Sequence, residues 1–490
     1  MKEIRLNYGH ILEINFYGKS VGLAKIWGLV YHISAQGRVS SCWQSGGVQD
    51  EPLLASNNDP RQKQEGMQLN LYHVRGLDSS QTSTSPFSFS DMIRKDEERV
   101  RSLHSTLANK DGVSNSDKFG GPNLLSTPLK SGLSIGSGNY YVKIGVGTPA
   151  KYFSMIVDTG SSLSWLQCQP CVIYCHLQVD PIFTPSSSKT YKTLPCSSSQ
   201  CSSLKDSTLN APSCSNKTKA CVYKASYGDT SFSIGYLSQD VLTLTPSEAP
   251  SSFVYGCGQD NQGLFGRAAG IIGLANDRLS MFAQLSNKYG NAFSYCLPTS
   301  FSAPNSSLSG FLSFGTSSLA SSSSPYKFTP LLKNPKIPSL YFLDLTTITV
   351  AGKPLEVAAS SYKVPTIIDS GTVITRLPVP VYNALKKSFV MIMSKKYAQA
   401  QGFSILDTCF KGSVKEMSTV PEIQIIFGGG AGLALKAHNT LIEIEKGVTC
   451  LAIAASSNPI SIIGNYQQQT FKVAYDVANS KIGFAAAACQ

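Results

Sequence analysis

Short apolar runs rich in β-branched residues alternate with polar turns along most of the chain after residue 139. Strand-like residues begin at Tyr140 and continue through Ile144 and Val146 into a Gly-Thr-Pro turn, and the next apolar run ends at Asp158. Runs of this length, bounded by Gly, Pro and Ser, are typical of β-strands. The pattern therefore predicts a mostly β protein with a few short helices.

Only three segments have the spacing of amphipathic helices. One follows Pro86, where Ser88 with Asp91 is a plausible helix start and charged residues populate the polar side. The other two end at Gly290 and begin at Pro380. The apolar positions that share a helical face are Ile93, Val100, Leu103 and Leu107 in the first helix, Leu279, Phe282 and Leu285 in the second, and Leu385 and Phe389 in the third.

A short motif occurs twice, about two hundred residues apart. Asp158 opens Asp-Thr-Gly-Ser and Asp369 opens Asp-Ser-Gly-Thr, each after a strand-like apolar run. A chain of this length should contain about 0.03 copies of the motif by chance. Each copy is later followed by two isoleucines and a glycine, which end at Gly273 and Gly464. The sequence therefore predicts two halves of similar plan.

These motifs resemble the pepsin family of aspartic proteinases, and the resemblance extends from Asn139 to the C-terminus. It implies an all-β, bilobal double β-barrel with an active-site cleft between the lobes. The cysteine-rich segment after the first motif is similar to the nepenthesin-type and chloroplast-nucleoid-type plant enzymes. The implied activity is aspartic endopeptidase action on polypeptides at acidic pH, without a cofactor or metal.

The resemblance also assigns roles to individual residues. Asp158 and Asp369 are the expected catalytic pair, and a hairpin over Tyr223 to Leu244 is the expected flap. Glycine beside each Asp permits a close backbone approach. The supporting residues are Thr159, Gly160, Ser161, Ser370, Gly371 and Thr372 around the pair, Tyr227 and Gly228 at the flap, and Trp165 as the hydrogen-bond partner of Tyr227.

Two neighbouring carboxyl groups can supply both a base and an acid. At about 3 Å they cannot both ionise readily, so one pKa falls and the other rises. One group then takes a proton from water while the other protonates the substrate oxygen. Because the pair titrates as a unit, the sequence does not assign the proton to either residue.

Thirteen cysteines divide into Cys42 and a dozen from Cys168 onward. An even number in the folded part favours six disulfides and an oxidising compartment. Zinc ligation by Cys168, Cys171, Cys175 and His176 is the alternative, although the remaining cysteines lack the repeated pair of metal fingers. The pairs implied by the resemblance are Cys168–Cys257, Cys171–Cys175, Cys196–Cys221, Cys201–Cys214, Cys296–Cys489 and Cys409–Cys450.

We expect four regions: an atypical extension (1–66), a prosegment (67–130), a first lobe (131–318) and a second lobe (319–490). By resemblance, the prosegment covers the cleft until it is removed, which makes the chain a zymogen. An ordinary surface helix is the alternative. The polar stretch from Asp111 to Ser137 is the expected cleavable connection.

The formal net charge is +12 over 490 residues. The lysines are scattered without an aromatic-interleaved basic stripe, so we expect no specific nucleic-acid binding. No apolar run is long enough for a membrane span. We expect a monomer in the apoplast or another secretory compartment, with a chloroplast as the alternative. Glycosylation sequons occur at Asn216 and Asn305, but the apolar stretch from Val21 to Ile33 is a poor signal peptide.

Three competing functions are compatible with parts of the sequence. Xylanase-inhibitor proteins of plants resemble this fold without full catalytic motifs, so an inactive binding protein is possible in principle, but both motifs are intact here. An organellar DNA-associated protease is another alternative. A Ser-His-Asp hydrolase would have to use His176 or His438, and no Gly-x-Ser-x-Gly motif accompanies them.

Overall fold

The computed structural model describes strands within residues 1–62 and then residues 67–73, 89–109, 139–227, 231–245, 248–263, 265–299, 310–319, 324–486 and 489. The chain divides into two compact units, Met1–Gln62 and Lys63–Gln490. The first unit contains five short strands that the sequence analysis did not predict. They are β1 (Ile4–Arg5), β2 (Ile11–Leu12), β3 (Gly22–Ile26), β4 (Leu29–Ile33) and β5 (Val39–Ser41).

The first half of the second unit is built on one large sheet. The predicted strands form β7 (Tyr140–Val146) and β8 (Lys151–Asp158), which pair antiparallel. Asp158 is the last residue of β8, and β16 (Gly270–Gly273) runs parallel to β8 with Gly273 opposite Asp158. The flap hairpin is β12 (Cys221–Ser226) and β13 (Phe232–Asp240). The neighbouring strands are β9 (Trp165–Gln167) and β15 (Phe253–Gln262).

The second half repeats this local plan. The strand β23 (Thr366–Ile368) leads to Asp369 and runs parallel to β32 (Ser461–Ile463), while β24 (Thr375–Pro378) pairs antiparallel with β32. Strands β8, β16 and β9 have the same relationship in the first half. The two sequence motifs therefore fold into two equivalent strand arrangements, each presenting one Asp.

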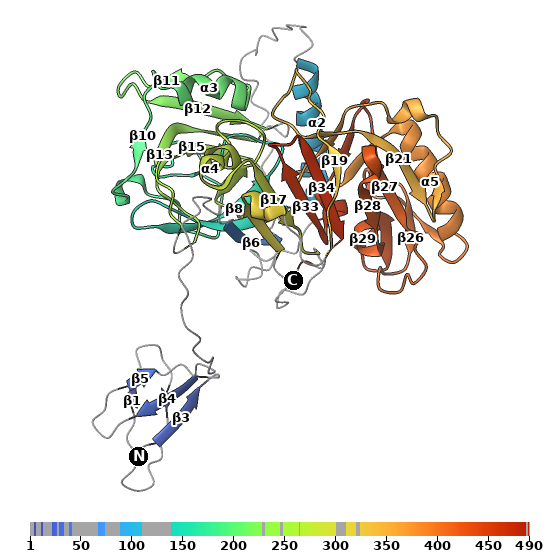
Figure 1. The fold of residues 1–490 in the computed structure, drawn as a ribbon, viewed down its shortest axis with the longest axis horizontal. Helices are drawn as coiled ribbons and strands as arrows, with labels where there is room; N and C mark the ends of the chain where they lie inside the picture. Colours follow the sequence, from blue (N-terminus) through green and yellow to red (C-terminus); the bar gives the residue numbers. More distant parts are fainter. Residues whose placement is uncertain are drawn as a thin grey trace, which may run out of the picture. The chain divides into compact units, whose positions relative to one another are not determined.

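Strands from both ends of the second unit join the large sheet between the halves. The order β7, β6 (Met67–His73), β18 (Gly310–Phe314), β17 (Ala292–Cys296), β33 (Phe471–Asp476), β34 (Lys481–Ala486), β19 (Lys327–Pro330) is continuous. Figure 1 shows β33 and β34 between the green strands of the first half and the orange strands of the second. The predicted all-β, two-lobed fold is confirmed, with open sheets in place of closed barrels.

Three of the helices follow the predicted amphipathic segments. They are α2 (Phe89–Asn109), α4 (Met281–Tyr289) and α5 (Val379–Met393). Ser280 caps α4 by accepting a hydrogen bond from the Ala283 N–H, and Gly290 ends it with a φ of 91°. The predicted strand from Tyr341 to Val350 is instead divided into β20 (Phe342–Leu343) and β21 (Leu345–Val350). The sequence analysis also missed α3 (Ser199–Thr208), which lies in the cysteine-rich segment.

Candidate active site

The two motif aspartates occupy equivalent buried positions. Asp158 is 3% exposed and Asp369 is fully buried. A Cβ at Gly160 would lie 2.7 Å from Oδ1 of Asp369, and one at Gly371 would lie even closer to Oδ1 of Asp158. Each carboxyl group therefore packs against the glycine of the other motif, and a side chain at either glycine would separate the pair.

Reciprocal hydrogen bonds join the two motif loops. The Ser370 N–H donates to Oγ1 of Thr159 at 2.9 Å, and the Thr159 N–H donates to Oγ of Ser370 at 3.1 Å. Both side chains are buried. Because each loop supplies one donor and one acceptor to the other, the two aspartates are held at a fixed mutual position.

Each carboxylate also accepts hydrogen bonds within its own loop. The Gly160 N–H donates to Asp158 at 2.9 Å, and the Gly371 N–H donates to Asp369 at 3.1 Å. The Thr372 hydroxyl donates to Oδ2 of Asp369 at 2.6 Å. The matching hydroxyl of Ser161 lies outside hydrogen-bond geometry with any described residue, although its proximity helps to lower the pKa of Asp158.

A guanidinium group from α2 lies between the two carboxylates. Nη2 of Arg99 is 2.7 Å from Oδ1 of Asp158 and 3.3 Å from Oδ1 of Asp369, and Nε is 3.2 Å from Oδ2 of Asp369. Both acids thus lie within hydrogen-bond distance of one nitrogen. The Arg99 side chain is 13% exposed, so this contact is largely shielded from solvent.

The two carboxyl groups have opposite pKa shifts. Burial raises the pKa of Asp158, and the charge of Asp369 raises it further against the opposing effect of Arg99. Burial also opposes ionisation of Asp369, but Arg99, Thr372 and the Gly371 N–H together hold its pKa below the usual value. The carboxylates in turn raise the pKa of Arg99, which stays charged. Such separation of two carboxyl pKa values is what acid–base catalysis by a pair requires.

Tyr227, the predicted flap residue, and its partner Trp165 lie near the carboxyl pair. Nε1 of Trp165 donates to the hydroxyl of Tyr227 at 2.7 Å, as the sequence predicts. Phe265 packs edge-on against both rings. Tyr227 also lines a cavity of about 90 Å³ together with Arg99 and Gly160. Gly228 lies outside the described residues.

The helix α2 covers this region through apolar contacts as well. Phe89, Met92 and Ile93 share one cluster with Val373 and Ile374. The following turns of the helix contribute Val100 and Leu103 to a second cluster. This cluster includes Phe342 of β20 and Ile367 of β23. The predicted apolar face of α2 is therefore buried over the same site that Arg99 enters.

A second ion pair joins α2 to the second half. Nη2 of Arg376 lies 2.9 Å from Oδ2 of Asp96, and the Val373 and Ile374 N–H groups donate to the same carboxylate. Burial raises the pKa of Asp96, although Arg376 and the two N–H groups oppose this shift. The sequence analysis did not single out Asp96, Arg99, Arg376 or Phe265.

Six disulfides occur among the described residues, and four of them match the expected pairs. These are Cys168–Cys257, Cys171–Cys175, Cys296–Cys489 and Cys409–Cys450. The expected pairs Cys196–Cys221 and Cys201–Cys214 are wrong. The structure pairs Cys196 with Cys214 and Cys201 with Cys221, because Cys201 is turned inward on α3 toward the first residue of β12.

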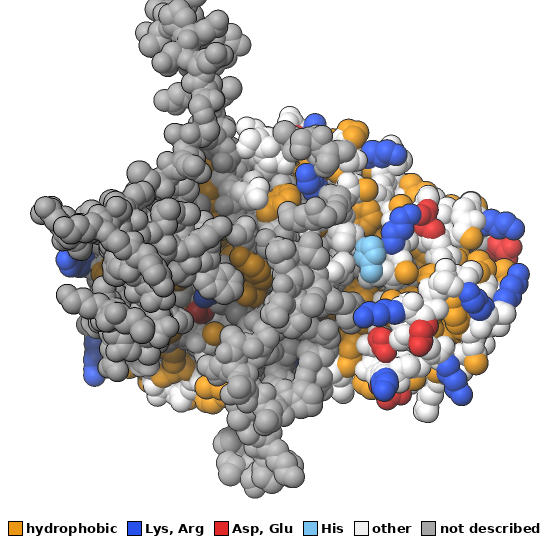
Figure 2. Space-filling view, turned by 90° about the horizontal axis from the view of Figure 1, so that it is seen from below, with side chains coloured by type: hydrophobic (Ala, Val, Ile, Leu, Met, Phe, Trp, Pro, Cys, Tyr) orange, Lys and Arg blue, Asp and Glu red, His pale blue; other side chains and the backbone are white. Residues whose placement is uncertain are grey.

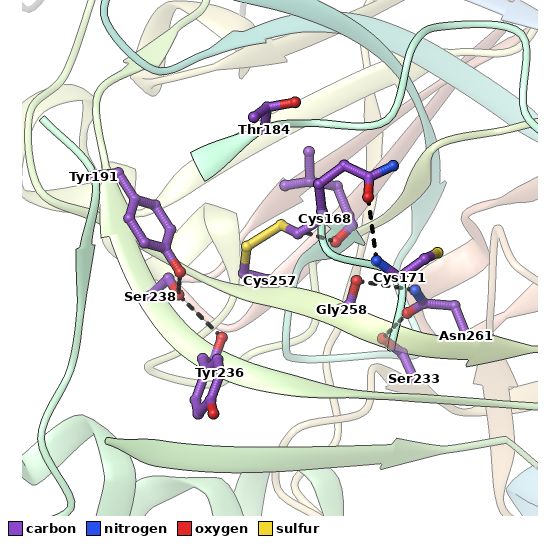
Figure 3. Close-up of a disulfide and its surroundings, with 12 residues drawn as sticks. Cys168, Cys171, Thr184, Tyr191, Ser233, Tyr236, Ser238, Cys257, Gly258 and Asn261 are labelled. Carbon is purple, nitrogen blue, oxygen red and sulfur yellow. Dashed lines mark hydrogen bonds between the residues drawn. A yellow bond between two sulfur atoms is a disulfide. The ribbon is translucent and has the colours of Figure 1, made fainter. Parts of the chain in front are cut away.

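The zinc alternative is contradicted by these bonds, since Cys168, Cys171 and Cys175 are all in disulfides. Figure 3 shows Cys168–Cys257 beside Gly258 and Asn261. The Asn261 amide donates to the Gly258 carbonyl at 3.0 Å. Burial lowers the pKa of His176 to about 4, and its Nε2 lies 2.8 Å from the Ala268 carbonyl oxygen. This histidine is thus a buried structural residue.

The structure describes one of the two predicted glycosylation sites. Asn216 is exposed, as a glycosylation site requires. Asn305 lies outside the described residues.

Comparison with known proteins gives a consistent assignment. The family model described as xylanase inhibitor N-terminal matches residues 140–316, and the one described as xylanase inhibitor C-terminal matches residues 340–486. An aspartyl protease family protein of Arabidopsis thaliana is 41% identical over 90% of this chain and 92% of the relative. Aspartic proteinase nepenthesin-2 of Nepenthes gracilis is 35% identical over 88% and 91%.

Solved structures support the fold. Basic 7S globulin from soybean superposes with a TM-score of 0.56 at 21% identity, over 72% of this chain and 94% of that chain. Conglutin gamma from lupine seeds gives the same TM-score at 20% identity, over 72% and 92%.

Proposed function

Because the chain belongs to the pepsin-like family of aspartic proteases, we propose that it is an aspartic endopeptidase whose catalytic pair is Asp158 and Asp369. The observation that carries this proposal is the presence of two buried carboxylates within 3.3 Å of one nitrogen of Arg99. In the free cleft, the space taken by this nitrogen is available to a water molecule.

Hydrolysis then follows from the asymmetry of the pair. The carboxylate form of one Asp takes a proton from the water, which attacks the peptide carbonyl carbon. The protonated carboxyl of the other Asp donates to the carbonyl oxygen. Collapse of the tetrahedral intermediate breaks the C–N bond. The departing nitrogen takes a proton from one Asp, and a hydroxyl of the intermediate returns a proton to the other Asp. Tyr227, positioned by Trp165, closes over the substrate.

We propose that the chain is made as a zymogen and that α2 belongs to its prosegment. Arg99 forms an ion pair with each of the two motif acids and occupies the space of the water, while the apolar face of α2 fills the cleft. An ordinary surface helix would have no reason to bury an arginine against two acids, since such burial is costly without paired charges. We propose the same four regions as in the sequence analysis: an extension (1–66), a prosegment (67–130), a first lobe (131–318) and a second lobe (319–490).

An inactive binding protein remains the second candidate, since the matching family models are named for xylanase inhibitors. The contacts within each motif argue for an enzyme. The reciprocal Thr159 and Ser370 bonds and the Thr372 bond to Asp369 serve to orient carboxyl groups. A binding surface would have no need of them.

The disulfides and the plant relatives agree with a secretory or extracellular location. Within this class we propose the apoplast, with a monomeric enzyme acting on polypeptides. Among the described residues, none of the helices is sufficiently long and apolar to span a bilayer. On the face shown in Figure 2, Lys and Arg side chains of described residues are interspersed with Asp and Glu, which offers no continuous basic stripe for nucleic acid.

The test is cleavage of denatured haemoglobin by processed protein between about pH 3 and 5, with and without pepstatin. Pepstatin-sensitive cleavage is expected. Failure to cleave at any acidic pH, with the N-terminus of the processed chain verified by sequencing, would favour the binding protein.

A further inference from the structure

The carboxylate of Asp96 occupies a pocket formed by the second half of the molecule. Three polar groups contact it: the Val373 N–H and the Ile374 N–H donate hydrogen bonds, the latter at 3.1 Å to Oδ2, and Nη2 of Arg376 forms an ion pair with Oδ2 at 2.9 Å. The side chains of Asp96 and Arg376 are 0% and 3% exposed. Two backbone donors and a guanidinium group form a receptor for a single carboxylate.

The receptor and its occupant belong to different parts of the proposed zymogen. Val373, Ile374 and Arg376 follow the catalytic Asp369 closely, whereas Asp96 lies in the helix that processing removes. Nη1 of Arg376 donates to the Ile374 carbonyl at 2.8 Å, which anchors the guanidinium group on its own strand. Once α2 has left, Nη2 and the two N–H groups lose this partner on the surface that the helix had covered.

We propose that this pocket is a substrate subsite of the processed enzyme that binds the side-chain carboxylate of an Asp or Glu residue. The inference rests on the proposed function and deepens it by naming a substrate preference. In the zymogen, the side chain of Asp96 then fills this subsite in place of a substrate side chain. Arg376 is its specificity-determining residue, because it supplies the only charge among the three donors.

The surroundings and the position of the pocket define the substrate further. Met92 and Ile93 of α2 pack against Val373 and Ile374, so the adjoining positions favour apolar side chains. Asp96 and Arg99 are about 4.5 Å apart along the helix axis. An extended peptide advances about 3.3 Å per residue. The acidic residue should therefore lie within about one to three residues of the cleaved bond.

The experiment compares peptides that differ only by Glu or Gln at each position near the cleaved bond. Processed enzyme is assayed at about pH 5.5, where free Glu is ionised. At one position, kcat/KM for the Glu peptide should exceed that for the Gln peptide by about tenfold. At the other positions, the ratio should stay close to about one.

Variants assign this preference to Arg376. The Arg376→Gln variant should bring the Glu-to-Gln ratio to about one, and Arg376→Lys should keep part of the preference. Lys387→Gln is the matched control, because it removes a positive charge from an exposed position of the same half, on α5. Its ratio should equal that of the unaltered enzyme. If Arg376→Gln does not fold, the unaltered enzyme and Arg376→Lys decide the question.

The outcomes separate this inference from the proposed function. Cleavage with equal rates for Glu and Gln at every position would overturn the subsite and leave the protease assignment intact. A Glu preference that persists in Arg376→Gln would also overturn it. Absence of pepstatin-sensitive cleavage of both the peptides and denatured haemoglobin would overturn the two proposals together.

Discussion

Asp158 and Asp369 have the same backbone setting but different side-chain partners. The hydroxyl of Thr372 donates to Asp369, whereas Ser161 at the equivalent position makes no comparable bond within the described residues. Burial and the charge of Asp369 raise the pKa of Asp158, whereas Arg99, Thr372 and the Gly371 N–H outweigh burial and lower the pKa of Asp369. The site is therefore prepared for one charged and one protonated carboxyl group.

Replacing either acid with its amide should remove catalysis. Asp158→Asn or Asp369→Asn leaves one carboxyl group, which cannot serve as both base and acid, so kcat should fall by at least about a thousandfold. The measurement is turnover of a fluorogenic peptide by processed enzyme, with circular dichroism and disulfide mapping as controls for folding. Near-normal turnover in either variant would contradict the shared-proton mechanism.

Removing the Thr372 hydroxyl should change the pH profile. Because this hydroxyl lowers the pKa of Asp369, Thr372→Val should raise that pKa, and the acidic limb of the kcat/KM profile should move upward by about half to one pH unit. Thr372→Ser retains the hydroxyl and should keep the original limb. A limb that shifts equally in both variants would show that shape, rather than the hydrogen bond, controls the titration.

The sequence singles out Asp158 and Asp369 because their motif is local and occurs twice. Arg99 could not be found in the same way. It lies on the charged side of α2, and its partners are 59 and 270 residues away along the chain. The exchanged partners of Cys196 and Cys201 have the same cause. Spacing alone allows either pairing, and the choice depends on how α3 packs.

At the scale of elements, the amphipathic helices and the Asp strands follow directly from their apolar periodicity. The missed helix α3 is rich in Ser and has few buried apolar side chains, and the disulfide from Cys201 to Cys221 links it to β12. The strand predicted around Asp344 is divided because the chain turns between two sheets at that residue. Tertiary contacts therefore override local pattern at these places.

The helix α2 should make the unprocessed chain latent near neutral pH. Arg99→Met removes the charge that pairs with both acids, so the initial rate on a small peptide should rise by about ten- to a hundredfold at pH 6. Arg94→Gln is the matched control, because Arg94 is exposed on the same helix. Equal latency in Arg99→Met and the unaltered chain would contradict the proposed role of α2, provided electrophoresis confirms that no cleavage has occurred.

Latency should also weaken as the pH falls. Protonation of Asp158 or Asp369 removes the ion pair of that acid with Arg99. Protonation of the pair at acidic pH therefore favours departure of the helix. Asp96 opposes this effect. Burial under the helix raises its pKa, so Asp96 takes up a proton more readily while α2 covers the cleft, and acidification favours that covered state. Asp96→Asn should accordingly steepen the gain of activity with falling pH, which rate measurements on unprocessed chain can test.

For the whole molecule, the disulfide Cys296–Cys489 closes a loop of 193 residues and joins the end of the chain to β17 of the first half. Changing both residues to Ala should lower the free energy of unfolding by about 2–5 kcal/mol, because the unfolded chain gains freedom. Changing both Cys171 and Cys175, which are only four residues apart, should have a smaller effect. Chemical denaturation of the two double variants provides the comparison, and equal losses would argue against the loop-length explanation.

The position of β6 has a practical consequence for anyone purifying this protein. The strand pairs with β7 on one side and β18 on the other, and the twelve cysteines downstream of α2 all pair with one another. A single nick downstream of α2 would thus yield two polypeptides that migrate separately in detergent but elute as one particle from a sizing column. On the proposed zymogen role, cleavage of the chain and release of the segment that contains α2 are separate events, and we expect full activity only after release.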